Sequence, residues 1–170
     1  MSAPKDAPQV GEPFPLSTLR HSVSHLMASA VAKLFPGVKE LLDRLCGRED
    51  VLVGLLTGNV QPGAMLKLDR FKLGDYFRFG AFGDDHEDRC ELARIALEKA
   101  GRITGRTVRG DEATVIGDTP RDVACARAIG ARAVIVATGL VARDELEKAK
   151  PDILLESFED VEGTLRAICA

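Results

Sequence analysis

The 170-residue chain has the length of one ordinary domain, and 45% hydrophobic with 29% charged residues indicates a globular rather than a disordered or fibrous protein. A net charge of -3, with both signs interspersed, gives no basic stripe of the kind that follows a phosphate backbone, so we expect no nucleic-acid partner. No apolar run approaches the length of a membrane span, and the N-terminus lacks the regions of a signal peptide, so we expect a cytoplasmic protein without membrane contact.

The N-terminal part is expected to hold a tail and one helix. Residues 1–16 carry four prolines among polar residues, which predicts a disordered tail. Apolar residues recur at helical spacing over residues 17–35, which predicts an amphipathic helix that ends before Pro36 and Gly37. Residues 36–170 are then expected to form a single core domain.

In that core, short apolar runs alternate with helical patterns. The expected strands are residues 51–56, 77–83, 113–117, 133–138 and 152–156, and the expected helices lie at about 38–47, 60–72, 88–101, 120–130, 141–149 and 157–170. This alternation implies right-handed crossovers, and therefore a mostly parallel sheet between helical layers, a Rossmann-like three-layer α/β/α fold. Ligands bind such sheets at the carboxyl ends of the strands.

Thr57, Gly58 and Asn59 follow the first of these strands. Their backbone N–H groups and the hydroxyl could accept an anion such as phosphate. The alternative is that they only cap the helix that follows.

Asp118 and Asp122 follow the strand 113–117 and are one helical turn apart. Both carboxylates could face one ion, and Mg²⁺ is the expected ion because it prefers hard oxygen ligands. The alternative is that Asp118 caps the helix and Asp122 is a solvated acid in its first turn.

Arg89 opens a predicted helix after the acidic turn GDDHED. A basic residue at that point could hold a phosphate dianion. The alternative is solvated charge at a helix end.

Together these features resemble the haloacid dehalogenase superfamily, in particular its phosphoglycolate phosphatase-like hydrolases. The resemblance covers about residues 34–170, and its most specific motif is Gly-Asp-Thr-Pro-Arg-Asp at 117–122. It implies Mg²⁺-dependent hydrolysis of a small phosphorylated metabolite, with Arg89 standing where the family has a lysine. The implied phosphate-binding residues are Thr57, Gly58, Asn59 and Arg89, and the implied Mg²⁺ ligands are Asp118 and Asp122.

The sequence departs from this family in its first strand. Family members begin with a strand that ends in Asp-x-Asp, whose first carboxylate attacks phosphorus and whose second acts as general acid and base. No such motif and no cap domain is found here, so no catalytic residue is assigned. The loss of that strand, which lies between those matching 51–56 and 113–117, predicts a gap in the sheet that another chain could fill, for example in a homodimer.

The N-terminal segment resembles a different family. Residues 19–37 are similar to the start of a module of threonyl-tRNA synthetases, with His21 and His25 on one face of the predicted helix. The Cys-x-x-x-His that completes the synthetase site is not present, so the two histidines are more simply surface or packing residues.

Three functions are therefore compatible with the sequence. The first is an Mg²⁺-dependent phosphohydrolase, impaired by the missing nucleophile. The second is a non-catalytic binding or self-assembling module completed by another chain, and the third is a synthetase-related editing fragment. The four cysteines contain no C-x-x-C pair and are expected to be small buried thiols rather than a metal site or a disulfide framework.

Overall fold

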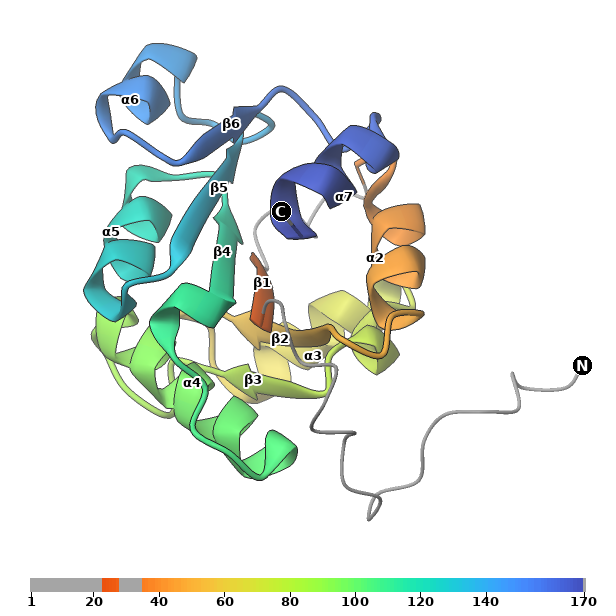
Figure 1. Ribbon diagram of the computed structural model, residues 1–170, viewed down its shortest axis with the longest axis vertical. Helices are drawn as coiled ribbons and strands as arrows, with labels where there is room; N and C mark the ends of the chain where they lie inside the picture. Colours follow the sequence, from red (N-terminus) through yellow and green to blue (C-terminus); the bar gives the residue numbers. More distant parts are fainter. Residues whose placement is uncertain (1–22, 28–34, 170) are drawn as a thin grey trace, which may run out of the picture.

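The computed structural model describes residues 23–27 and 35–169, and within them one parallel six-stranded sheet forms the centre of the protein (Figure 1). The strand order is β3-β2-β1-β4-β5-β6. The strands are β1 (Val23–Met27), β2 (Leu52–Leu56), β3 (Phe79–Ala81), β4 (Ala113–Gly117), β5 (Arg132–Val136) and β6 (Ile153–Leu155). The predicted Rossmann-like α/β fold is confirmed.

Helices connect the strands at close to the predicted positions. They are α2 (Val38–Cys46), α3 (Gln61–Arg70), α4 (Arg89–Thr104), α5 (Pro120–Ile129), α6 (Arg143–Lys148) and α7 (Val161–Cys169), with short 3₁₀ turns η1 (Gly74–Tyr76) and η2 (Gly110–Glu112). Helix α4 continues past Gly101 and ends at Gly105, which has a φ of 68°. Among the described residues, no helix has both the length and the apolar character needed to cross a bilayer.

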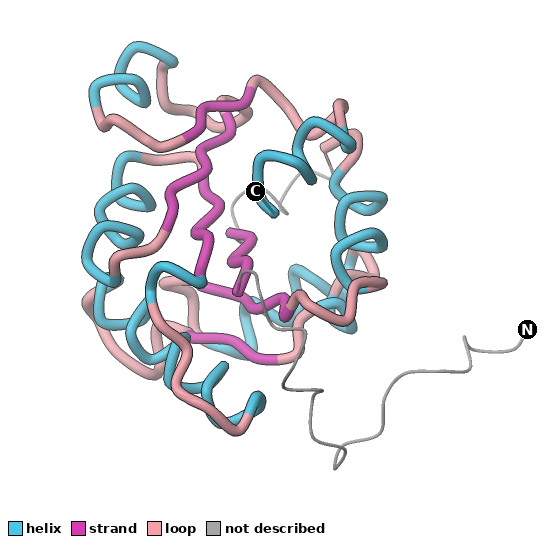
Figure 2. The backbone as a smooth tube through the Cα atoms, viewed as in Figure 1, coloured by secondary structure: helices cyan, strands magenta, loops and turns pink. Residues whose placement is uncertain are grey.

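Alternating side chains divide the core into two layers, one on each face of the sheet. Val53 and Leu55 of β2 belong to the cluster that contains α2 and α7, whereas Leu52 and Leu56 belong to the cluster that contains α4 and α5. This follows from the two-residue period of a strand, whose successive side chains point to opposite faces. Figures 1 and 2 show the same arrangement, with α4 and α5 on one side of the strands and α2 and α7 on the other.

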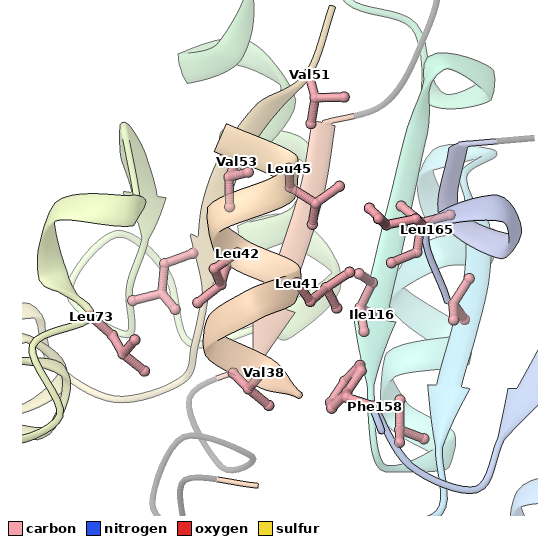
Figure 3. Close-up of a cluster of buried hydrophobic side chains, with 14 of the residues drawn as sticks. Val38, Leu41, Leu42, Leu45, Val51, Val53, Leu73, Ile116, Phe158 and Leu165 are labelled. Atoms are coloured by element: carbon pink, nitrogen blue, oxygen red, sulfur yellow. The ribbon is translucent and has the colours of Figure 1, made fainter. Parts of the chain in front are cut away.

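Helix α2 shows how the sequence pattern produces one of these layers. Its buried residues Val38, Leu41, Leu42 and Leu45 recur at i, i+3, i+4 and i+7, and so form one apolar stripe. In Figure 3 this stripe faces the sheet, with Phe158 of the α7 layer beside it. Phe158 is 1% exposed and closes the end of this core.

The central strand β1 corrects two of our predictions. The helix predicted over 17–35 is wrong for Val23–Met27, which form a strand between β2 and β4. The predicted gap at that position is therefore also wrong. The remainder of the predicted helix and the predicted tail at 1–16 lie outside the described residues.

Tertiary pairing explains why the helical pattern fails there. Each side of β1 has a parallel partner, with His25 opposite Gly54 of β2 and opposite Val115 of β4. A strand paired on both sides satisfies its backbone groups, and this outweighs the weak local preference of a five-residue segment. The filled sheet removes the reason to expect a homodimer through a missing strand. His25 lies in this strand rather than in the predicted helix, and His21 lies outside the described residues.

Hydrogen exchange tests the central position of β1. We expect amides of residues 24–27 to exchange as slowly as those of β4, because both strands lie in the interior of the sheet. Exchange is measured by mass spectrometry of peptides, with the edge strand β3 as the internal comparison. Exchange in β1 faster than in β3 would contradict the assignment.

Gly37 allows α2 to lie close to the segment before α7. It is the N-cap of α2 with a φ of 85°, and a Cβ there would lie 1.9 Å from the carbonyl oxygen of Phe158. The position therefore excludes a side chain both by conformation and by contact.

We predict that Gly37→Ala lowers the free energy of unfolding by about 3 kcal/mol or more, because left-handed strain and a backbone clash combine. Gly105→Ala is the matched control, since Gly105 has a similar φ of 68° but no atom within 4 Å of its Cβ position. Gly105→Ala should lower the free energy of unfolding by only about 1–2 kcal/mol. Chemical denaturation measures both, and equal losses would show that the contact with Phe158 has no energetic role.

Candidate functional site

The candidate site lies at the carboxyl edge of the sheet, around the end of β1. The pairing register places Met27, the last residue of β1, opposite Leu56, the last residue of β2, and β1 pairs with β4 as far as His25 and Val115. Thr57 and Asp118 are the first residues after β2 and β4, and they therefore flank the end of β1 on either side. Because neighbouring strands lie about 4.8 Å apart, their backbones are separated by about 10 Å.

Asp122 is the most enclosed charged group of the site. Its side chain is 0% exposed, and its Oδ2 accepts hydrogen bonds from the backbone N–H of Asp118 (3.1 Å), the N–H of Thr119 (3.0 Å) and the Thr119 hydroxyl (2.9 Å). Its Oδ1 lies 2.9 Å from Nη2 of Arg89. This carboxylate therefore joins the end of β4, the start of α5 and the start of α4.

Gly117 provides the space that Asp122 occupies. A Cβ at residue 117 would lie 2.2 Å from Cγ of Asp122, so any side chain there would displace the carboxylate. The Gly-Asp-Thr-Pro-Arg-Asp motif thus has a steric as well as a chemical basis. The carboxylate of its last residue, Asp122, fills the space that a side chain on its first residue, Gly117, would need. The alternative that Asp122 is a solvated acid is wrong, and the N-cap of α5 is Thr119 rather than Asp118.

Arg89 is the first residue of α4 and is held by Asp122 rather than solvated. Its side chain is 25% exposed, and the ion pair with the fully buried carboxylate directs the guanidinium toward the carboxyl edge of the sheet. The structure therefore brings Arg89 and Asp118 together through Asp122.

Thr57, Gly58 and Asn59 form a tight turn after β2. Thr57 is 2% exposed, its N–H donates to the carbonyl of Ala81 (3.0 Å), and its Oγ1 accepts the N–H of Asn59 (3.2 Å). The N–H of Asn59 is thus already used within the turn. The alternative that these residues cap α3 is wrong, because Val60 is the N-cap and Asp84 accepts the N–H of Gln61 (2.7 Å).

The acidic turn before α4 has structural roles. Asp88 caps α4 by accepting the N–H of Cys90 (2.7 Å), and Asp85 accepts from Nζ of Lys99 (2.7 Å) and from the N–H of Phe82 (2.9 Å). Burial tends to raise the pKa of Asp85, but these two hydrogen bonds hold it below its ordinary value. The carboxylates of Asp85 and Asp88 are therefore used within the fold.

Of the two predicted metal ligands, Asp118 is the better placed. It is 7% exposed and directly follows β4 at the carboxyl edge, whereas Asp122 is fully buried, with three hydrogen bonds to its Oδ2. The Oδ1 of Asp122 lies 2.9 Å from Arg89 but accepts no hydrogen bond among the described residues. Residues 23–27 and 35–169 contain no group of three or more His, Cys, Asp or Glu side chains arranged to hold a metal. A single carboxylate suits an ion such as Mg²⁺ that keeps several waters and takes phosphate oxygens as further ligands.

The loop after β5 adds two residues that the sequence did not single out. A Cβ on Gly139 would lie 2.5 Å from Oδ2 of Asp118, so this glycine packs directly on the carboxylate. Within the described part of the chain, the buried Oγ1 of Thr138 has no hydrogen-bond partner. The sequence holds a related signal, because Thr138-Gly139 comes one residue after the end of β5, and Thr57-Gly58 comes directly after β2.

Asp122→Asn tests the importance of the buried pair. We expect a loss of about 3 kcal/mol in the free energy of unfolding, because the mostly buried guanidinium of Arg89 would lose the charge of the fully buried carboxylate that faces it. Chemical denaturation measures the loss. Asp111→Asn is the control, since it breaks an exposed ion pair with Arg109 and should leave the denaturation midpoint unchanged. An unchanged midpoint for Asp122→Asn as well would show that the pair does not stabilise the fold.

Sequence comparison finds relatives of this chain among the phosphoglycolate phosphatases. The chain is 31% identical over 129 residues to the phosphoglycolate phosphatase of Synechococcus elongatus, and 29% identical over 131 residues to that of Pectobacterium atrosepticum. These alignments cover 76% and 75% of this chain, but 58% and 53% of the two relatives, so the chain spans little more than half of their length.

The fold of this chain is similar to that of a solved structure. The haloacid dehalogenase-like family hydrolase of Streptococcus pneumoniae superposes with a TM-score of 0.67 at 18% identity, over 77% of this chain and 59% of that one. A sequence profile of the family described as haloacid dehalogenase-like hydrolase matches residues 5–136, which include the segment 19–37 that resembled a synthetase. The synthetase resemblance is not supported by these comparisons. The chain belongs to the haloacid dehalogenase-like hydrolase family.

Proposed function

We propose that this chain binds a small phosphomonoester at the end of β1 and is related to the phosphoglycolate phosphatases, but hydrolyses its ligand slowly. The observation that carries the proposal is the arrangement of Thr57, Asp118 and the Arg89–Asp122 pair around the end of one strand. A hydroxyl, a carboxylate and a guanidinium at one strand edge suit a phosphate group and its counter-ion.

The phosphate group would be held from two sides. Thr57 would donate its hydroxyl and Gly58 its N–H from the turn after β2. From α4, Arg89 would contribute a positive charge, directed by the buried carboxylate of Asp122. In this proposal Asp122 is a positioning residue for Arg89 and is not itself a metal ligand.

Asp118 would hold Mg²⁺ together with water and phosphate oxygens. When bound, the ion would supply positive charge that neutralises the phosphate and fixes its orientation. Asp118 alone provides this contact among the described residues at the strand edge, so we expect Mg²⁺ to bind weakly until phosphate is present.

The attacking carboxylate is the part that this chain lacks. Residues 23–34 read VSHLMASAVAKL and contain no aspartate or glutamate. The family's Asp-x-Asp follows its central strand, and here the residues that follow β1 are Ala28, Ser29 and Ala30. Without a carboxylate to form the covalent intermediate, turnover should fall by orders of magnitude.

A gain-of-function variant tests this account. We expect the parent chain to hydrolyse p-nitrophenyl phosphate or 2-phosphoglycolate at a rate near background with Mg²⁺. The double variant Ala28→Asp and Ala30→Asp should raise kcat by about 100-fold or more, because it restores nucleophile and general acid.

The matched control is Ala28→Asn with Ala30→Asn, which has the same shape but cannot form the covalent intermediate and should stay near background. Adding Asp118→Ala to the active double variant should remove the gain. If the parent itself turned over at a rate of about 1 s⁻¹ or more, as ordinary enzymes do, the nucleophile would lie elsewhere in the chain and our proposal would be wrong.

A further inference from the structure

The four cysteines differ in exposure, contrary to the expectation that all are small buried thiols. Cys125 is buried, Cys90 and Cys169 are partly buried, and Cys46 is exposed. Two of them form a pair, because Sγ of Cys90 lies 4.0 Å from Sγ of Cys125. These residues are 35 positions apart in the sequence and belong to different helices, α4 and α5.

We propose that Cys90 and Cys125 form a reversible disulfide that links the first turn of α4 to α5. The two helices already pack against each other, so the sulfur atoms have to close a gap of about 2 Å to reach the length of a disulfide bond. Rotation of the two side chains about χ1, with a small shift of the helices, provides a movement of this size.

The two thiols have different roles in the reaction because their exposure differs. Cys90 is partly exposed and meets a small-molecule disulfide first, whereas Cys125 is 1% exposed and has the Cys90 sulfur 4.0 Å away. Burial, together with the adjacent Cys90, raises the pKa of Cys125 to about 12. The second step therefore becomes faster as the pH rises.

The reaction is a two-step exchange with oxidised glutathione as the oxidant. The Cys90 sulfur attacks one sulfur of the glutathione disulfide, the S–S bond breaks, and one glutathione leaves with the proton of Cys90. The Cys125 sulfur then attacks the Cys90 sulfur and releases the second glutathione with the proton of Cys125. Two protein thiols lose two electrons and two protons, and one glutathione disulfide becomes two thiols.

The location gives the link a consequence for the site. Cys90 directly follows Arg89 in α4, and Cys125 lies one helical turn after Asp122 in α5. The bond would therefore fix the two helix segments that carry the buried ion pair.

Peptide mapping of the full chain tests the proposal. The chain is incubated with oxidised glutathione, the remaining thiols are blocked, and the protein is digested with trypsin without reduction. Trypsin releases Cys90 in the peptide CELAR and Cys125 in DVACAR. We expect a linked peptide with the summed mass less two hydrogens, from protein that runs as a monomer on a non-reducing gel, and we expect dithiothreitol to remove it.

Variants separate the two steps. Cys125→Ser should trap Cys90 as its glutathione adduct, and Cys46→Ser should leave the linked peptide unchanged. The adduct on Cys46 in the parent confirms that the oxidant is active. Two results with the parent chain would overturn the proposal. One is glutathione on Cys90 while Cys125 remains a free thiol, and the other is a Cys90–Cys125 link found only between two chains. Neither result depends on a variant that folds.

Discussion

The buried carboxylate of Asp122 is the interaction on which the candidate site depends. One oxygen accepts three hydrogen bonds from residues 118 and 119, and the other pairs with Arg89, so a single side chain fixes three segments of the chain. A buried carboxylate without such partners would be strongly destabilising, so the geometry of the loop after β4 and the position of Arg89 are determined together. Gly117 is required by the same carboxylate, since the strand has to leave room for it.

The same interaction explains why two aspartates four residues apart have different roles. In a pattern of sequence letters they are equivalent, and both were predicted to bind Mg²⁺. In the fold, Asp122 is buried against Gly117 and faces Arg89, while Asp118 stays at the carboxyl edge beside Gly139. In this chain the motif therefore combines an aspartate at the edge of the sheet, Asp118, with a buried aspartate that pairs with a basic residue, Asp122.

The sequence predicted the sheet best where strands are flanked by turn residues, and least well at β1. Residues 113–117 are bounded on both sides by polar turns, and their predicted limits match β4. Val23–Met27 lie in a segment with helical spacing of apolar residues and small, helix-compatible neighbours, and only the pairing with β2 and β4 makes them a strand. No local property of five residues reveals two partners that lie about 30 and 90 positions later in the chain.

Predictions for Thr57, Arg89 and Asp118 did not depend on this strand, which is why the site could be assembled although the prediction for its central element was wrong. Thr138 and Gly139 were missed because a Thr-Gly pair becomes informative only when the order of strands is known.

The contact between α4 and α5 relates the electrostatics of the site to the thiol pair. Both helices present small buried residues to this layer of the core, with Ala93 and Ala96 in α4 and Ala126 in α5. Small side chains allow helix axes to approach closely, and only at a close approach can the short side chains of Cys90 and Cys125 meet. Larger residues in this layer would separate the helices and would lengthen the Arg89–Asp122 contact as well. The small buried residues of α4 and α5 are thus part of the reason that the buried ion pair between Arg89 and Asp122 can form.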